Sequence, residues 1–198
     1  MIRFYLIRHG HTAAIDRYLA GRASGTELTE EGHRQVERLV TRMHDVPLAA
    51  VVSSPLARTR QTADPLARDH GLTVSVAPAL NEIDFGAWTG STFAAVDRDD
   101  RWRRYNTARA ITAPVGGELM IEAQVRALKA LLDLRDRNVG GHAAIVSHGD
   151  VIRGLLLYFL GMPVDFVHRL EVAPARISVV DLSEDDVRVV QMNGDSAP

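Results

Sequence analysis

Ionisable side chains stand directly after apolar runs at several separate places in the sequence. Arg8 and His9 follow the first run, Arg58 follows the second, Glu82 lies past the third, and His148 follows a later one. Guanidinium groups can grip the oxygens of a phosphate in a forked geometry, and backbone amides at helix starts add to the same positive field. One such residue alone is more often solvated or structurally hydrogen bonded, but the coincidence of several indicates a site. The chemistry indicated is the binding of an anion such as phosphate.

The elements that must position these residues alternate between apolar β-type runs and amphipathic helical stretches. The expected strands cover residues 2–7, 48–54, 72–80, 142–150 and two segments within 175–192. The expected helices cover residues 29–46, 56–71, 91–108, 118–137 and 151–161. The hydroxyl of Thr29 is expected to cap the free amides at the start of the first of these helices. This alternation predicts a three-layer α/β/α sandwich with a mostly parallel central sheet, in a single domain over residues 1–198. Ligands of such sheets bind beyond the carboxyl ends of the strands, which is where the ionisable residues stand.

The composition is that of an ordinary globular protein, with 198 residues, 46% of them hydrophobic, and a net charge of −2. The near balance of charges gives no electrostatic support for binding nucleic acid or a membrane surface. The chain has no cysteine, which excludes disulfides, zinc–thiolate sites and thiol nucleophiles. Its N-terminus lacks the apolar core of a signal peptide, and its longest apolar stretch, residues 154–162, is far below the ~20 residues of a membrane-spanning helix. We therefore expect a soluble, cytoplasmic protein.

Five blocks of the sequence, between residues 6 and 153, together carry a resemblance to a known family. They read LIRHGHT at 6–12, ELTEEGHRQ at 27–35, SSPLARTRQTA at 53–63, LNEIDFGAWTG at 80–90 and VSHGDVIR at 146–153. In this order they resemble the histidine phosphatase superfamily, also called the phosphoglycerate-mutase-like family. The tripeptide RHG alone would be weak evidence of that family, whereas five blocks in order are specific.

The resemblance implies a role for each residue of the expected site. His9 would be the nucleophile that forms a phosphohistidine; this requires a neutral imidazole, and the arginines would lower its pKa in that direction. Arg8, Arg58 and a protonated His148 would hold the phosphate oxygens. Glu82 would protonate the leaving oxygen and then deprotonate the attacking water, although neighbouring arginines would lower the pKa that this role needs raised. We expect neither a metal nor a cofactor.

Four further residues are expected to contact the substrate: His11, Thr12, Arg22 and Gly149. His11 stands where relatives commonly have Glu or Gln, and it could contact the substrate or only hydrogen bond the loop. Arg22 corresponds to a basic residue of relatives that recognise a second anionic group. Ile15 stands where many relatives carry an asparagine that helps to hold phosphate, so one donor is expected to be missing.

The expected substrate is a small phosphomonoester whose phosphate meets the motif residues. The rest of the ligand would meet the loop 13–26 and the segment 91–117. Arg153, on an expected helix, is expected to face solvent, and Trp88 and Trp102 are expected to pack in the core. The expected partner is thus a small molecule, with no nucleic acid and no membrane. The sequence leaves the oligomeric state open between a monomer and a homodimer.

Hydrolysis is favoured over the alternative of a 2,3-bisphosphoglycerate-dependent phosphoglycerate mutase. Mutases that resemble this chain are longer, with an insert that shields the phosphoenzyme from water. Here only 25 residues lie between Trp88 and Pro114, so water could reach the phosphohistidine. The expected enzyme is therefore a metal-independent phosphoric monoester hydrolase.

Two other classes of function stay open at this point. A metallohydrolase could bind its metal through His9, His11, His148 and Asp150, but this would leave the two motif arginines unexplained. A phospho-ligand binding protein without catalysis is the second class, but binding alone requires neither a nucleophile nor a proton donor.

Overall fold

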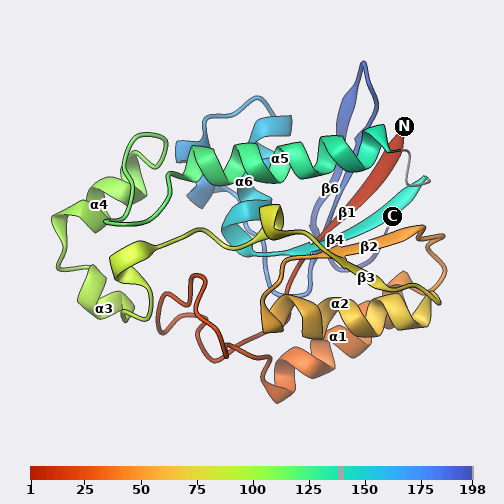
Figure 1. The fold of residues 1–198 in the computed structure, drawn as a ribbon, viewed down its shortest axis with the longest axis horizontal. Helices are drawn as coiled ribbons and strands as arrows, with labels where there is room; N and C mark the ends of the chain where they lie inside the picture. Colours follow the sequence, from red (N-terminus) through yellow and green to blue (C-terminus); the bar gives the residue numbers. More distant parts are fainter. Residues whose placement is uncertain (138–140, 198) are drawn as a thin grey trace.

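The computed structural model describes residues 1–137 and 141–197, and a six-stranded sheet forms its centre (Figure 1). The strands are β1 (Ile2–Arg8), β2 (Ala50–Ser53), β3 (Val74–Val76), β4 (His142–Ser147), β5 (Ile177–Leu182) and β6 (Val187–Gly194). Their order is β3-β2-β4-β1-β5-β6, and β5 runs antiparallel to both of its neighbours while the other pairs are parallel. The predicted sandwich with a mostly parallel sheet is therefore confirmed.

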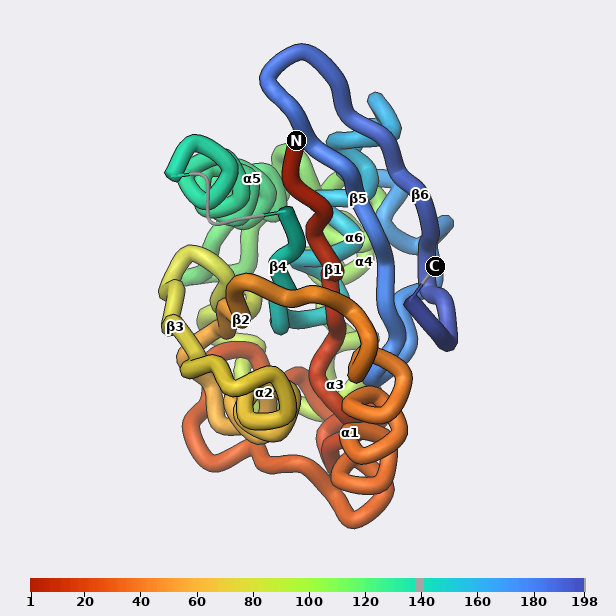
Figure 2. The backbone as a smooth tube through the Cα atoms, turned by 90° about the vertical axis from the view of Figure 1, so that its right-hand side faces the viewer, coloured from red at the N-terminus to blue at the C-terminus, as the bar shows by residue number. Residues whose placement is uncertain are grey.

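Helices cover both faces of the sheet. They are α1 (Glu30–Met43), α2 (Ala57–Asp69), α3 (Phe93–Val96), α4 (Asp100–Thr107), α5 (Met120–Asp136) and α6 (Gly149–Phe159). Figure 1 shows α1 and α2 on one side of the sheet, α5 and α6 on the other, and α3 and α4 beyond one end. Figure 2 shows the sheet from the side, with the β5–β6 hairpin at its edge. In the described part of the chain, no helix combines the length and apolarity needed to cross a membrane.

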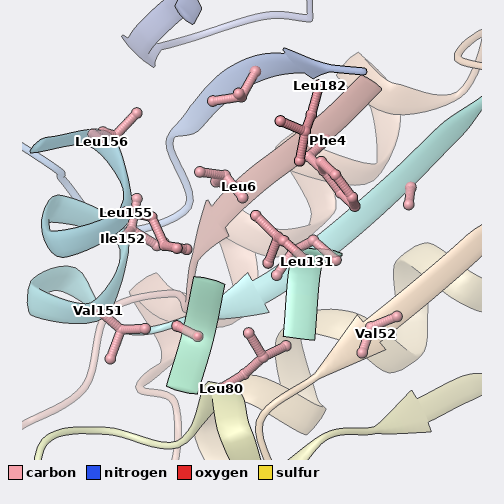
Figure 3. Packing of buried hydrophobic residues seen from close by; sticks show 14 of the residues in the cluster. Phe4, Leu6, Val52, Leu80, Leu131, Val151, Ile152, Leu155, Leu156 and Leu182 are labelled. Carbon is pink, nitrogen blue, oxygen red and sulfur yellow. The ribbon is translucent and has the colours of Figure 1, made fainter. Parts of the chain in front are cut away.

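The two faces of β1 divide the core, because successive side chains of a strand point to opposite sides. Phe4 and Leu6 belong to the cluster that α5 and α6 cover, where Figure 3 shows them beside Leu131 and Ile152. Tyr5 and Ile7 belong to the cluster that α1 and α2 cover. β1 is thus buried on both faces, and its carboxyl end is held firmly in place.

The segment from 91 to 108 differs from the single helical stretch expected there. It forms two short helices, because α3 ends at Val96 and the backbone of Asp99 is extended; the Asp99 side chain then caps α4 by accepting from the Arg101 amide. Trp88 and Trp102 are buried and pack edge to face at 5.3 Å, which confirms their expected packing role. These two helices and their aromatic cluster form a small cap at one end of the sheet.

The start of α1 packs closely on the loop that follows β1. The hydroxyl of Thr29 accepts from the Gly32 amide at 3.2 Å, as predicted for a helix cap. The Thr29 amide donates to the carbonyl of His11 at 3.0 Å. A Cβ atom at Gly32 would lie 2.3 Å from that same carbonyl oxygen and would clash with it. The missing side chain of Gly32 therefore allows α1 to hold this loop.

We predict that Gly32→Ala destabilises the protein by about 1–3 kcal/mol, because the added methyl must push two backbone segments apart. Gly154→Ala is the matched control, since Gly154 is also buried and helical but its Cβ would meet the nearest atoms at an ordinary 3.7 Å. That control should change stability by about 1 kcal/mol or less, with alanine favoured by its helix propensity. Urea unfolding of the three proteins measures the difference, and equal midpoints would contradict the proposed close contact.

Candidate active site

The carboxyl ends of three neighbouring strands bring the predicted residues to one edge of the sheet. Arg8 ends β1 and is paired with Ser147, the last residue of β4, which His148 follows. Glu82 follows the segment after β3, and Arg58 lies in the first turn of α2. A pocket of about 270 Å³ opens at this edge and is lined by Arg8, His9, Arg58 and Glu82.

His9 is 4% exposed, and its orientation is set by its own neighbour in the chain. Its Nδ1 lies 2.7 Å from the carbonyl oxygen of Gly10, which can only accept, so Nδ1 carries the proton and donates. The lone pair of the imidazole is therefore on Nε2. Burial, with the charges of Arg58 and Arg8, lowers the pKa of His9 well below its ordinary value. This environment favours a neutral ring whose Nε2 is free to act as a base or a nucleophile.

Two buried guanidinium groups lie beside this ring, each anchored to a distant carbonyl. Arg8 Nη1 donates to Val172 O at 2.7 Å, and Arg58 Nη2 donates to Gly21 O at 2.8 Å. These bonds leave Arg8 Nε and Arg58 Nη1 buried without a hydrogen-bond partner among the described residues. An unpaired buried N–H group is costly, and an anion in the pocket could accept from both groups.

His148 is fully buried behind His9 and does not itself line the pocket. The two rings meet edge to face at 5.3 Å, and His148 Nε2 hydrogen bonds with Ser54 Oγ at 2.8 Å. Its Nδ1 lies 3.8 Å from Glu82 Oε2. Burial, with the charges of Arg58 and His9, lowers the pKa of His148 well below its ordinary value. This environment favours a neutral His148 in the pocket without phosphate, in contrast to the protonated form expected from the resemblance.

Glu82 has the raised pKa that a proton donor needs. Burial is the main cause and the charge of Asp150 adds to it, and together they outweigh the opposing charges of Arg58 and Arg8. The carboxyl oxygen Oε1 accepts from the amide of Ile83 at 2.9 Å. The neighbouring arginines, which were expected to lower this pKa, have a smaller effect on it than burial does.

Arg22, expected to contact the substrate, instead holds the backbone of Glu82. Its Nε donates to Glu82 O at 2.8 Å, and Arg126 Nη2 donates to the same oxygen at 3.1 Å. Both arginines pair with Glu118 at 2.7 Å. Arg22 does not line the pocket. Its guanidinium is occupied by these partners, so it is a positioning residue for Glu82.

The other expected substrate contacts divide into two groups. Thr12 and Gly149 line the pocket, as does Ile15. His11 does not: its Nδ1 hydrogen bonds with Thr29 Oγ1 at 2.9 Å, and its amide donates to Gln35 at 2.8 Å. Of the two readings of His11, the structure supports the loop hydrogen bond over a substrate contact.

Two residues that line the pocket were not expected at a phosphate site. Arg153 lines the pocket and is not a solvated helix residue; it donates to Asp150 at 2.8 Å and to Leu170 O at 2.9 Å. Asp150 lines the pocket too and accepts from the buried Arg109 at 2.6 Å. The spacing of Asp150 and Arg153 by three residues, on a helix that begins at a strand end, is the signal that could have found them.

The four residues considered as metal ligands do not come together. His11 is turned to Thr29, and Asp150 is held between two arginines. Among residues 1–137 and 141–197, no group of three His, Asp or Glu side chains is arranged so that it could hold a metal ion.

Comparison with known proteins identifies the family. Residues 4–195 match the model of the histidine phosphatase superfamily (branch 1). The chain is 31% identical over 188 residues to an Escherichia fergusonii protein named "Probable phosphoglycerate mutase GpmB", covering 93% of this chain and 86% of that one.

Two solved structures of the same fold are phosphatases by name. The alpha-ribazole phosphatase of Shigella flexneri superposes with a TM-score of 0.89 at 27% identity, covering 100% of this chain and 98% of that one. A mycobacterial glucosyl-3-phosphoglycerate phosphatase superposes with a TM-score of 0.86 at 25% identity, covering 98% of this chain and 99% of that one. Together with the family match, these similarities establish that the chain belongs to branch 1 of the histidine phosphatase superfamily.

Proposed function

We propose that the protein is a phosphomonoester hydrolase that works through a phosphohistidine on His9. The observation that carries this proposal is the neutral His9 ring, with its lone pair on Nε2, beside the two unpaired buried N–H groups of Arg8 and Arg58. A nucleophile and two oxyanion donors at one pocket are what phosphoryl transfer requires.

In the first step, His9 Nε2 attacks phosphorus. The P–N bond forms as the P–O bond to the alcohol breaks, and Glu82 gives its proton to the leaving oxygen. Arg8 and Arg58 donate to the non-bridging oxygens. A bound phosphate dianion raises the pKa of His148, and its protonated form then adds positive charge behind His9.

In the second step, water replaces the histidine. The Glu82 carboxylate takes a proton from the water as its oxygen attacks phosphorus, and the P–N bond breaks to restore the neutral ring. Inorganic phosphate leaves, and Glu82 is again protonated for the next cycle.

The small cap favours water over a second phosphate acceptor. The 25 residues between Trp88 and Pro114 form only α3 and α4, and the pocket is lined at its rim by the exposed Asp16. A phosphohistidine in such a pocket would be accessible to water. This supports hydrolysis, although the names of the similar proteins include both a mutase and phosphatases.

We propose further that the reaction needs no metal ion. Arg8 and Arg58 supply the positive charge that a metal would otherwise supply to the transferring group. Asp150, the carboxylate beside Arg153 in the pocket, already bonds two guanidinium groups.

We predict that His9→Asn lowers kcat for phosphomonoesters by at least about a thousandfold, because no phosphoenzyme can form. His33→Asn, on the exposed face of α1, is the control and should retain full activity. EDTA should leave the wild-type rate unchanged, and vanadate should inhibit it. Phosphate release on small esters measures all four results. A His9→Asn protein with more than a tenth of the wild-type rate would exclude the assigned nucleophile.

We predict a pH profile that is flat in the acid range and falls as pH rises. His9 acts in its neutral form, so its lowered pKa keeps it active at acid pH, whereas Glu82 acts when protonated, so activity is lost as pH rises through its raised pKa. Glu82→Gln should remove this fall in activity and lower kcat/KM for an alkyl phosphate by about a hundredfold or more. The loss of kcat/KM in Glu82→Gln should be smaller for an aryl phosphate, because an aryl leaving group needs less protonation.

The matched control for this experiment is Glu27→Gln, which changes an exposed carboxylate in the loop before α1. It should keep the wild-type profile. If the fall in kcat/KM with rising pH persists unchanged in Glu82→Gln, another group is the proton donor.

A further inference from the structure

Beyond the phosphate, the pocket has an apolar wall built from two segments that are distant in sequence. Ile15 and Leu19 come from the loop after β1, and Phe85 and Phe93 come from the segment that leads into α3. These side chains lie where the remainder of a phosphate ester must go, since the phosphate end is taken by the arginines and His9. They offer apolar contact and no hydrogen bonds.

The apolar wall is preformed by hydrogen bonds and packing. Leu19 N donates to Ser91 O at 2.9 Å, and Gly90 N donates to Leu19 O at 2.7 Å, which ties the two segments together. Phe85 is buried against Tyr105, with ring centroids 6.3 Å apart. A wall that is already ordered costs little conformational entropy when a ligand binds to it.

The charges that line the pocket leave no cation for a second anionic group. Arg8 and Arg58 face the phosphate, and Arg153 is paired with Asp150 and with the carbonyl of Leu170. The three lining arginines are opposed by two lining aspartates, Asp16 and Asp150. Arg109 also pairs with Asp150, so a bound phosphate dianion balances the positive charge that remains.

From this wall and this charge balance we propose that the substrate is a monophosphate ester of an uncharged alcohol with an apolar face. The inference rests on the proposed function and refines it by naming the substrate class. A volume of about 270 Å³ limits the ligand to a small molecule, because pockets for small ligands begin near about 300 Å³. A second phosphate or carboxylate would meet Asp16 or the apolar wall. This disfavours phosphoglycerates and hence the mutase alternative.

Binding of non-hydrolysable phosphonates tests the proposal separately from catalysis. Benzylphosphonate carries an apolar group beside its phosphonate, and 3-phosphonopropionate carries a carboxylate. Calorimetry should give a Kd for benzylphosphonate at least about tenfold below that of 3-phosphonopropionate, since burying an apolar group of this size contributes about 1.5–3 kcal/mol. An equal or tighter Kd for the carboxylate compound would overturn the proposal.

Substitutions in the apolar wall test whether benzylphosphonate binds against it. Phe93→Ala should weaken the binding of benzylphosphonate by about fivefold to tenfold. Phe166 is a partly buried phenylalanine outside the pocket, so Phe166→Ala should leave this binding unchanged. Ile15 lies outside the core clusters, and Ile15→Thr keeps the branched shape of its side chain. This variant should weaken the binding of benzylphosphonate by about threefold or more. If neither wall variant changes the Kd of benzylphosphonate, the apolar wall is not its site and the proposal is wrong.

A variant of Asp16 tests whether its charge disfavours a second anionic group on the ligand. Asp16 has a positive φ of 62°, a conformation that Asn tolerates, so Asp16→Asn should keep the loop intact. It should lower the Kd of 3-phosphonopropionate by about threefold or more and leave the Kd of benzylphosphonate unchanged. Asp186→Asn, in the β5–β6 turn, is the control and should change neither ligand. An unchanged Kd for 3-phosphonopropionate in Asp16→Asn would contradict the charge argument.

Turnover of three phosphate esters distinguishes a failure of the proposed substrate class from a failure of the proposed hydrolase activity. With active enzyme, kcat/KM should be higher for benzyl phosphate than for glycerol 3-phosphate, and lowest for 3-phosphoglycerate, although all three have alkyl leaving groups. If 3-phosphoglycerate is turned over best, the substrate class is wrong and the hydrolase proposal stands. If benzylphosphonate binds as expected but no ester is hydrolysed, the hydrolase proposal fails and the ligand class stands.

Discussion

The burial of two guanidinium groups beside a histidine ring is the constraint on which the site depends. Arg58 is 2% exposed, and moving such a charge out of water is costly unless its hydrogen-bonding groups find partners. Carbonyl oxygens of Val172 and Gly21 each take one bond from an arginine, and an N–H group of each arginine stays unpaired. A phosphate would satisfy these groups, so the same feature that costs stability in the free protein favours binding of an anion.

Burial also explains how one pocket favours the neutral forms of both a base and an acid. Low solvation disfavours the charged form of any group, so it lowers the pKa of His9 and raises the pKa of Glu82. The arginines strengthen the effect on His9 and oppose it on Glu82, where burial and Asp150 prevail. The two groups therefore reach complementary protonation states in a shared environment. The backbone of Glu82 is fixed by Arg22 and Arg126, which also bond Glu118.

The pocket thus has two parts with separate origins. Its charged part comes from strand ends and the first turn of a helix, which the family motifs specify. Its apolar wall comes from the loop after β1 and the segment that leads into α3, where this chain carries Ile15, Leu19 and Phe93. Membership of the superfamily bears on the first part, and the proposed substrate class rests on the second. This division is consistent with similar proteins that bear the names of different phosphatases and a mutase.

The sequence by itself determined the alternation of strands and helices, the cap at Thr29 and the strand ends at which the ionisable residues stand, because these depend on local periodicity and short-range hydrogen bonds. The tertiary structure alone decided that His11 bonds to Thr29, that Arg22 holds Glu82, and that Arg153 reaches the pocket. Each of these outcomes depends on which groups the fold brings near one another. The protonation of His148 and Glu82 depends in the same way on burial, which is a property of the packed molecule and not of any short stretch of its sequence.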